Sequence, residues 1–330
     1  MSEQPDLISI VVPVYNEEGN LKLLYERVSA VFEKLPADFQ LILVNDGSRD
    51  RSAEIIHELH ERDPRVCGIL FSRNFGQDAA LTAGLDAVQG HAAVLMDADL
   101  QDPPELIPAM IEKWKEGFDV VAARREKRRG ETILKKSTSF MFYRVMRFMV
   151  GWEFPKDTGD FRLMDRKVVD AFAQCPQYNR FVRSLLTWTG FRLTTIGYER
   201  AERNAGDTGY TFWKSLALAI TSITNFSIVP LRMATYLGFL IMVLSGVAMV
   251  AYVVFKLLGM VAMPGLTTLA ISLWFLGGIQ CLLLGVIGEY VGRTYLESQH
   301  RPIYIVREAL GVRPAIARGA DVKATGEDRG

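Results

Sequence analysis

The stretch ISIVVPVYNE, residues 8–17, decides the fold of the N-terminal part of the chain. Its first seven residues are largely apolar and β-branched, and the polar, turn-like segment YNEEGN follows them. A short apolar run bounded by turn residues is typical of a buried β-strand. The sequence therefore predicts a strand over residues 8–14 with a loop directly after it.

The same pattern recurs at four further places along the chain. The runs are LILVND (41–46), VCGILF (66–71), AAVLMD (92–97) and DVVAA (119–123). Segments between the runs, such as LKLLYERVSAVFEKL, have the apolar spacing of amphipathic helices. Apolar strands that alternate with helices predict a Rossmann-like α/β domain, in which helices cover both faces of a mostly parallel sheet. Ligands of such sheets bind beyond the carboxyl ends of the strands, so the residues after each run are the place to look for a site.

Polar and acidic side chains follow three of these predicted strands. Tyr15 and Glu17 follow the first strand, Asp46 follows the second, and Asp97 and Asp99 follow the fourth. Carboxylates that converge at one edge of a sheet repel each other unless a cation neutralises them. Oxygen ligands of this kind suit Mg²⁺ or Mn²⁺, which can bind a diphosphate and stabilise its charge as it leaves.

The spacing of the DxD pair bears on the metal interpretation. In extended backbone, Asp97 and Asp99 would point to the same side, and Gln101 would continue the alternation. An isolated DxD is more often a solvated surface turn, so the metal interpretation depends on the motifs around it.

Composition excludes several classes of function. The 38 basic and 38 acidic residues give no net charge, so a basic surface for nucleic acid is not indicated. The three cysteines are far apart, which argues against zinc or disulfides and fits a reducing compartment. The chain has no P-loop and no GxSxG motif, and we expect no cleavable signal peptide at its start.

Two long apolar stretches follow the α/β pattern. Residues 233–258 carry a single charge, Lys256, and residues 259–288 carry none. Each stretch exceeds the ~20 helical residues that cross a hydrocarbon core of about 30 Å. Pro264 and Gly265 lie between them and favour a tight reversal. The sequence predicts a transmembrane hairpin, and the alternative is a pair of buried helices in a soluble protein.

Positive charges outside the two stretches predict their orientation. They are Arg232 before the first stretch and Arg293, Arg301 and Arg307 after the second. The positive-inside rule then places both termini in the cytoplasm and the protein in the cell membrane. The expected order is a cytoplasmic domain (1–210), an interfacial helix (211–232), two transmembrane helices (233–258 and 264–288), and a cytoplasmic segment (289–330) with a disordered tail from about residue 312.

Five motifs in the same order carry a family resemblance: VVPVYNE, VNDGSRD, SRNFGQDAALTAGLDAVQG, DADLQDPPE and DTGDFRLMDR. Together they resemble the polyprenyl-phosphate branch of glycosyltransferase family 2, which includes dolichyl-phosphate mannose synthases and bacterial undecaprenyl-phosphate glucosyltransferases. The likeness spans about residues 7 to 307. It implies a GT-A domain, Mg²⁺ or Mn²⁺, and inverting transfer of a sugar from a nucleotide donor to a polyprenyl phosphate.

The resemblance also assigns roles to single residues. It gives the donor pocket to Pro13, Tyr15, Glu17, Asp46, Asp97 and Arg203, with Asp46 expected to bond the base. Asp99 and Gln101 match the metal side of the site, and Asp160 matches the catalytic carboxylate, with Asp157 as its nearest rival. Arg124 and Arg128 match the arginines that bind the acceptor phosphate. Gly209 stands where the family usually has a lysine, which puts the phosphate contact of that loop in doubt.

Several alternatives stay open on the sequence alone. UDP-glucose is the favoured donor by overall likeness, with UDP-GlcNAc, UDP-galactose and GDP-mannose behind it. A catalytically degenerate scaffold that binds nucleotide-sugar or lipid is a different class of function, although the acids at 97, 99 and 160 argue against it. The expected partners are the donor, the lipid acceptor and the membrane, without nucleic acid, and self-association is left open.

Overall fold

The computed structural model describes residues 6–125, 158–175, 177, 180, 182, 188–198, 227–258 and 266–312. These residues belong to two compact units, each described by itself. The first unit contains the described residues up to 198 and those from 302 onward, and the second contains residues 227–301.

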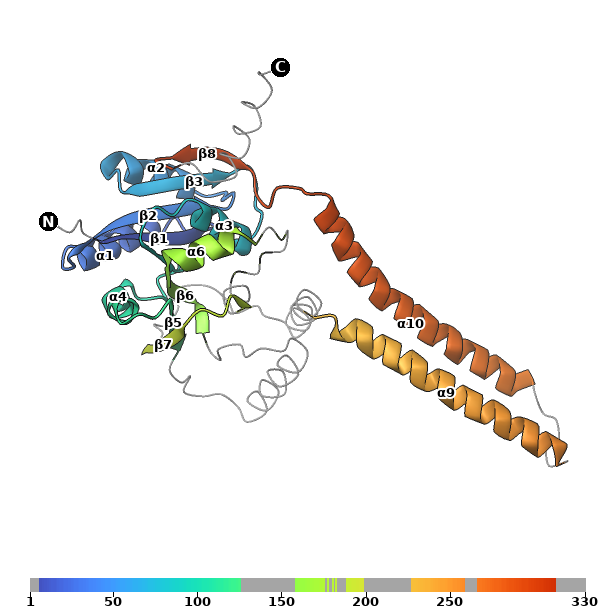
Figure 1. The fold of residues 1–330 in the computed structure, drawn as a ribbon. Coiled ribbons are helices and arrows are strands. Elements are labelled where there is room, and N and C mark those ends of the chain that lie inside the picture. Colours follow the sequence, from blue (N-terminus) through green and yellow to red (C-terminus); the bar gives the residue numbers. More distant parts are fainter. Residues whose placement is uncertain are drawn as a thin grey trace, which may run out of the picture. The chain divides into compact units, whose positions relative to one another are not determined.

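One mixed sheet forms the centre of the first unit (Figure 1). Its order is β7-β5-β6-β4-β1-β2-β3-β8, in which β6 and β8 run antiparallel to the other strands. The strands are β1 (Asp6–Val14), β2 (Ala37–Asn45), β3 (Val66–Phe71), β4 (Ala92–Leu95), β5 (Val120–Arg125), β6 (Thr158–Asp165), β7 (Leu193–Tyr198) and β8 (Val306–Leu310). The five predicted strands correspond to β1 to β5, and the predicted Rossmann-like α/β domain is confirmed.

Helices connect the strands and cover the sheet. They are α1 (Leu21–Phe32), α2 (Ser52–Arg62), α3 (Gln77–Asp86), the short 3₁₀ helix η1 (Pro104–Leu106), α4 (Ile107–Lys115) and α6 (Arg166–Ala173). Leu21, Leu24 and Val28 form the buried face of α1, as the helical spacing of its apolar residues predicts. A Cβ atom at Gly84 of α3 would clash with Val11 of β1, so this glycine allows the helix to lie close to the sheet.

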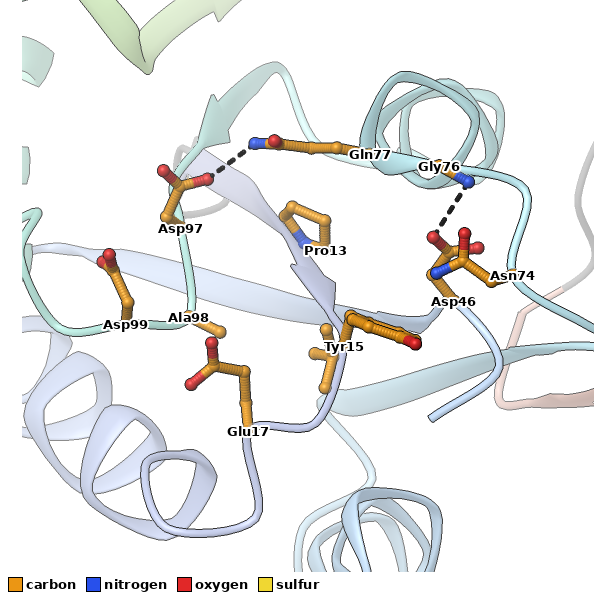
Figure 2. A pocket seen from close by; sticks show the side chains of 11 residues that line it. Pro13, Tyr15, Glu17, Asp46, Asn74, Gly76, Gln77, Asp97, Ala98 and Asp99 are labelled. Atoms are coloured by element: carbon orange, nitrogen blue, oxygen red, sulfur yellow. Dashed lines mark hydrogen bonds between the residues drawn. The ribbon is translucent and has the colours of Figure 1, made fainter. Parts of the chain in front are cut away.

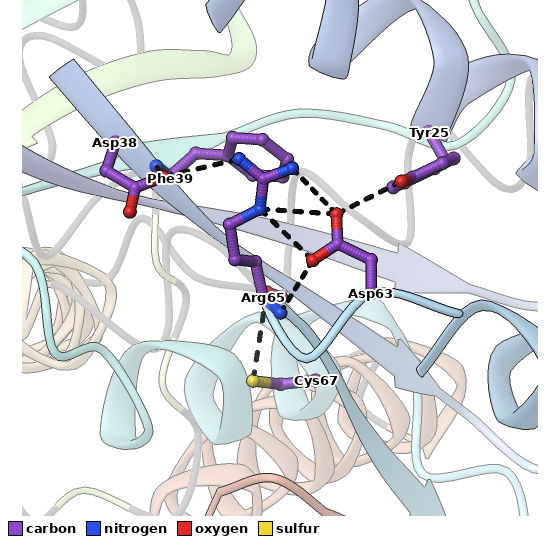
Figure 3. A network of polar contacts seen from close by, with 6 residues as sticks. All are labelled: Tyr25, Asp38, Phe39, Asp63, Arg65 and Cys67. Atoms are coloured by element: carbon purple, nitrogen blue, oxygen red, sulfur yellow. Dashed lines mark hydrogen bonds and ion pairs between the residues drawn. The ribbon is translucent and has the colours of Figure 1, made fainter. Parts of the chain in front are cut away.

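A network of polar side chains lies at the end of the sheet where β2 and β3 begin (Figure 3). Arg65 donates to both carboxylate oxygens of Asp63, at 2.8 Å from Nη2 and 3.1 Å from Nε, and Tyr25 donates to the same carboxylate at 3.0 Å. The guanidinium lies 4.3 Å from the ring centre of Phe39. The hydrogen bond from Arg65 holds the pKa of Asp63 below its usual value, against the opposing effect of burial.

Replacing Arg65 with methionine is expected to lower the melting temperature by roughly 2–4 °C, which corresponds to about 1 kcal/mol for a domain of this size. The carboxylate of Asp63 has a depressed pKa. The contribution of Asp63 to the free energy of unfolding is therefore complete above the pKa of the unfolded state, about 3.9. It is lost as the pH falls through the lower pKa of the folded state. Thermal unfolding between pH 3 and 7 measures both effects. Lys34→Met, at an exposed position, is the control, and equal melting temperatures for the two variants would contradict the prediction.

The second unit contains two long antiparallel helices, α9 (Val229–Leu257) and α10 (Leu266–Ser298). The hydroxyl of Tyr290, near the end of α10, donates to the carbonyl oxygen of Ser227, just before α9, at 2.6 Å. Segments 229–248 and 272–298 are long and apolar enough to cross a membrane, with mean hydropathies of 1.7 and 1.5, and neither is buried. Large apolar side chains such as Trp274, which is 84% exposed, cover both helices.

The helix bounds refine the sequence expectation for these segments. Arg232, expected before the first span, lies in the first turns of α9, and α10 continues past residue 288 to Ser298. The Pro264–Gly265 reversal, most of the expected interfacial helix (211–226) and the tail from residue 313 lie outside the described residues. After α10 the chain returns to the first unit, where β8 pairs with β3; the sequence patterns do not predict this strand.

Candidate donor and metal site

A cavity of about 320 Å³ lies beyond the carboxyl ends of β1, β2 and β4 (Figure 2). This volume is in the range of small-molecule sites. Its lining residues are Pro13, Val14, Tyr15, Glu17, Asp46, Asn74, Gly76, Gln77, Asp97, Ala98 and Asp99. Five of the six predicted donor residues and one of the two predicted metal ligands therefore line one cavity. The sixth donor residue, Arg203, lies outside the described residues.

Side-chain hydrogen bonds join the loops that follow β1 and β2. The backbone N–H of Asn16 donates to Ser48 Oγ at 3.0 Å, and that of Arg49 donates to Asn16 Oδ1 at 2.9 Å. The N–H of Glu17 donates to Ser52 Oγ at 3.0 Å. Asn16 has a φ of 57°, a left-handed conformation that asparagine tolerates better than most residues. The motifs alone do not predict these contacts, although side chains that bond the backbone of turns are common in segments such as NDGS.

Asp46 joins the second strand to the loop before α3. Its side chain is buried, and its two oxygens accept from the N–H groups of Phe75 at 2.6 Å and Gly76 at 2.9 Å. Burial raises the pKa of Asp46, and the two amide donors oppose that rise. A Cβ at Gly47 would lie 2.5 Å from the backbone carbon of Arg73, so only glycine fits there. Asp46 therefore shapes the cavity wall, and its predicted bond to the base of the donor stays a prediction.

Replacing Asp46 with asparagine is expected to raise the Kd for the donor nucleotide at least tenfold, because a carboxamide accepts at one oxygen only and leaves one amide donor without its partner. The raised pKa adds a pH effect: in the wild-type chain, nucleotide binding should weaken as the pH falls through that pKa, when Asp46 becomes protonated. Calorimetric titration of both proteins at two pH values measures this. Asp170→Asn, at an exposed position of α6, is the control, and equal Kd values for Asp46→Asn and the wild type would contradict the prediction.

The DxD segment forms a turn rather than extended backbone, since β4 ends at Leu95. Asp97 and Asp99 nevertheless lie on the same side of the cavity, opposite Asp46 (Figure 2). Gln77 Nε2 donates to Asp97 Oδ1 at 3.0 Å. Leu100 has a φ of 60°, which ends the predicted alternation, and Gln101 is buried and absent from the cavity lining. The extended-backbone argument for Gln101 is therefore wrong, and its metal role stays a prediction.

A buried aspartate holds this turn in place. Asp102 is 2% exposed and accepts from the N–H of Asp97 at 3.3 Å and from the hydroxyl of Tyr198 at 3.0 Å. Tyr198 is the last residue of β7, far from the DxD segment in sequence. Because only the folded sheet brings the two together, no local pattern could have identified Tyr198.

Asp160 lies on β6, the antiparallel neighbour of β4. Arg162, two residues on and 2% exposed, donates to the carbonyl oxygens of Gly159 at 2.7 Å and Asp160 at 3.3 Å. These bonds fix the backbone around Asp160. Arg124 is exposed near the end of β5, opposite Thr158 in register, whereas Arg128 lies outside the described residues.

The residues present fit a hard divalent cation. Among the described residues, no three His, Cys, Asp or Glu side chains cluster tightly enough to hold an ion by themselves. Mg²⁺ usually retains waters and binds through one or two carboxylates together with substrate phosphates. Asp97 and Asp99, which face a cavity of nucleotide size, match that arrangement. The site therefore suits a metal that binds together with a diphosphate.

Comparisons with known proteins identify the family of the chain. Residues 9–172 match the family described as Glycosyl transferase family 2. The chain is 49% identical over 304 residues to the uncharacterized glycosyltransferase YkcC of Bacillus subtilis, covering 92% of this chain and 94% of the relative. It is 42% identical over 304 residues to the prophage bactoprenol glucosyl transferase homolog of Escherichia coli, covering 91% of this chain and 98% of the relative. It is 41% identical over 300 residues to the bactoprenol glucosyl transferase of Shigella phage SfV, covering 91% and 98%.

Among solved structures, the mannosyl-3-phosphoglycerate synthase of Rubrobacter xylanophilus aligns with a TM-score of 0.47 and 16% identity, covering 69% of this chain and 74% of that one. The family match and the sequence relatives, which are 41–49% identical over more than nine-tenths of the chain, show a glycosyltransferase. The chain belongs to glycosyltransferase family 2. The family resemblance seen in the sequence motifs is confirmed.

Proposed function

We propose that the protein transfers a hexose from a nucleotide-sugar to a polyprenyl phosphate at the cytoplasmic surface of the cell membrane. The observation that carries the proposal is the cavity, in which Asp46 after β2 lies opposite Asp97 and Asp99 after β4, beyond the carboxyl ends of the parallel strands. Relatives that are about 40% identical over nearly their whole length are named bactoprenol glucosyl transferases, which supports a polyprenyl acceptor and glucose as the sugar.

The donor would bind along the loops after β1 and β2. Tyr15 and Asp46 would contact the base, and Pro13 and Glu17 would line its surroundings. Asp97 would lie near the ribose and diphosphate, and Arg203 would close the pocket from its loop. The rigid, hydrogen-bonded form of the two loops supports this assignment, because a preorganised pocket loses less entropy when it binds.

Asp99, with Asp97 beside it, would hold Mg²⁺ or Mn²⁺. Gln101 is buried and does not line the cavity, so it would support the metal site without lying at the cavity surface. When bound, the cation would neutralise the diphosphate as it leaves. Asp160 would face the acceptor. Because a phosphate monoester is already anionic and nucleophilic at neutral pH, Asp160 would orient or electrostatically tune the acceptor rather than deprotonate it. Attack from the face opposite the diphosphate inverts the anomeric centre.

The acceptor is a lipid whose phosphate lies at the membrane surface. Arg124 and Arg128 would bind this phosphate, since guanidinium groups pair well with phosphate oxygens. Helices α9 and α10 would cross the membrane as a hairpin with both chain ends in the cytoplasm, which is supported by their length, apolar surface and flanking arginines. The hairpin would keep the enzyme where its acceptor is concentrated.

The test offers radiolabelled UDP-glucose, UDP-GlcNAc, UDP-galactose and GDP-mannose separately to the purified full-length protein with undecaprenyl phosphate and Mg²⁺. Thin-layer separation should show a labelled lipid, strongest with UDP-glucose, that mild acid releases as a free sugar. Transfer from another donor would change the sugar assigned to the enzyme and leave the proposed transfer to a polyprenyl phosphate unaffected. Nucleotide binding without any lipid product would refute the proposal and favour the degenerate scaffold.

A further inference from the structure

The segment that follows α10 reaches into the core of the first unit. Tyr304 is 2% exposed, and its hydroxyl donates to Asp86 Oδ2, at the end of α3, over 2.9 Å. Its ring stacks on Phe71, the last residue of β3, with a centroid distance of 5.1 Å and an interplanar angle of 13°. The neighbouring Ile305 accepts the N–H of Ser72 at 3.0 Å through its carbonyl oxygen. Tyr304 therefore packs against both elements that border the loop of residues 72–76.

This loop forms one wall of the donor cavity. Phe71 meets Phe75 edge to face at a centroid distance of 5.7 Å, and the guanidinium of Arg73 lies 4.4 Å from the ring centre of Phe75. The N–H of Phe75 is the donor 2.6 Å from the carboxylate of Asp46. An uninterrupted chain of contacts therefore runs from Tyr304 through two aromatic rings to a residue that lines the cavity.

We propose that Tyr304 is a positioning residue for the donor pocket. It holds the rings of Phe71 and Phe75 in place, and these rings in turn fix the position of the loop (72–76) whose backbone binds Asp46. The proposal rests on the proposed function, since the cavity must bind a nucleotide. The chain segment beyond the two long helices then supports the donor site, although none of its residues lines the cavity.

The polar contact of Tyr304 is suited to a permanent role. Burial and the adjacent Asp86 both raise the pKa of the tyrosine, so it remains a hydrogen-bond donor at all physiological pH values. Burial also raises the pKa of Asp86, opposed by Tyr304 and by Arg180, whose Nη1 lies 3.8 Å from Asp86 Oδ1. Removing the hydroxyl of Tyr304 would leave the buried carboxylate of Asp86 without one of its hydrogen bonds. Removing the ring would also take away the side chain on which Phe71 stacks.

The test compares Tyr304→Leu, Tyr304→Phe and the wild-type full-length protein by calorimetric titration with UDP and GDP in the presence of Mg²⁺. Leucine removes the ring and the hydroxyl, and we expect the Kd of the nucleotide that binds tighter to rise at least about fivefold, because misplacing a loop by even 1 Å is costly. Phenylalanine retains the stack and should change the Kd by about two- to threefold. In initial-rate assays the KM for the nucleotide-sugar should rise, while kcat and the KM for the polyprenyl phosphate should stay within about twofold.

Ile305→Ala is the matched control, because Ile305 is exposed and its bond to Ser72 uses only backbone. A lower melting temperature of Tyr304→Leu with an unchanged Kd would show a merely structural role and overturn the inference. If Tyr304→Leu does not fold, Tyr304→Phe decides, and a Kd equal to that of the wild type overturns it. If the wild-type chain binds neither nucleotide, the proposed donor site itself is wrong, an outcome distinct from the failure of Tyr304 alone.

Discussion

Replacing Asp99 with alanine should reduce sugar transfer by at least about 10³-fold, because the loss of a hard-ion ligand leaves several kcal/mol of diphosphate charge uncompensated, and each 1.4 kcal/mol is a factor of ten in rate. Asp99 lines the cavity beside Asp97, where a cation and the diphosphate would bind together. The measurement is the initial rate of label transfer to undecaprenyl phosphate with Mg²⁺ or Mn²⁺ present. Excess EDTA should stop the wild-type enzyme to a similar extent, and added metal should restore it.

Asp170→Ala is the matched control for Asp99. It removes an exposed aspartate of α6 whose partner is Arg166, at 2.8 Å, and it should leave the rate unchanged. Full turnover of the wild type in excess EDTA would refute the metal assignment. Loss of activity in both variants would indicate a general effect of removing acidic residues rather than a metal ligand.

Replacing Asp160 with asparagine should lower turnover by at least ~100-fold, the usual scale for a positioned catalytic group, and leave the Kd for the donor nearly unchanged. The substitution preserves size and the strand, and the two bonds from Arg162 to the backbone do not depend on the Asp160 carboxylate. Under the proposed function, the substitution removes the negative charge that would act on the acceptor. Steady-state rates together with calorimetric donor titration separate the two effects.

The second variant in this experiment is Asp157→Asn, which alters the nearest rival carboxylate in the same motif and should retain most activity. If donor binding by Asp160→Asn were lost as completely as turnover, Asp160 would belong to the donor site. If Asp157→Asn were the more damaged of the two, the catalytic role would pass to Asp157.

The central strands could be predicted from sequence because they are buried on both faces and read as continuous apolar runs. The three strands that were not predicted, β6, β7 and β8, lack this signal. β6 contains the buried Arg162, β7 is only partly buried over most of its length, and β8, with the sequence VREAL, is mostly exposed at the edge of the sheet. Charged or half-exposed strands of this kind resemble loops in a single sequence, since their burial depends on neighbours that no local window contains.

The same distinction applies to the candidate site. Residues directly after β1, β2 and β4 could be predicted because parallel strands present their carboxyl ends at one edge. The residues that hold them in place could not, because each pairs with a partner distant in sequence. Asp102 with Tyr198 and Asp86 with Tyr304 are the two examples. The local sequence pattern thus identifies the residues that line the cavity, whereas contacts between residues distant in sequence determine the shape of the cavity.

The pairing of β3 with β8 has a consequence for how the protein is made. A chain emerges from the ribosome N-terminus first, so β3 is complete long before β8, and both long helices are synthesised in between. Until then β3 is an open edge, with unpaired backbone groups that can bind strands of other chains. A chain that stops before Tyr304 would retain this open edge and would lack the side chain that packs on Phe71 and bonds Asp86, and it would be a target for proteases and aggregation. The sheet is therefore completed only after both long helices have been synthesised, and the contacts of Tyr304 with Phe71 and Asp86 can form only then.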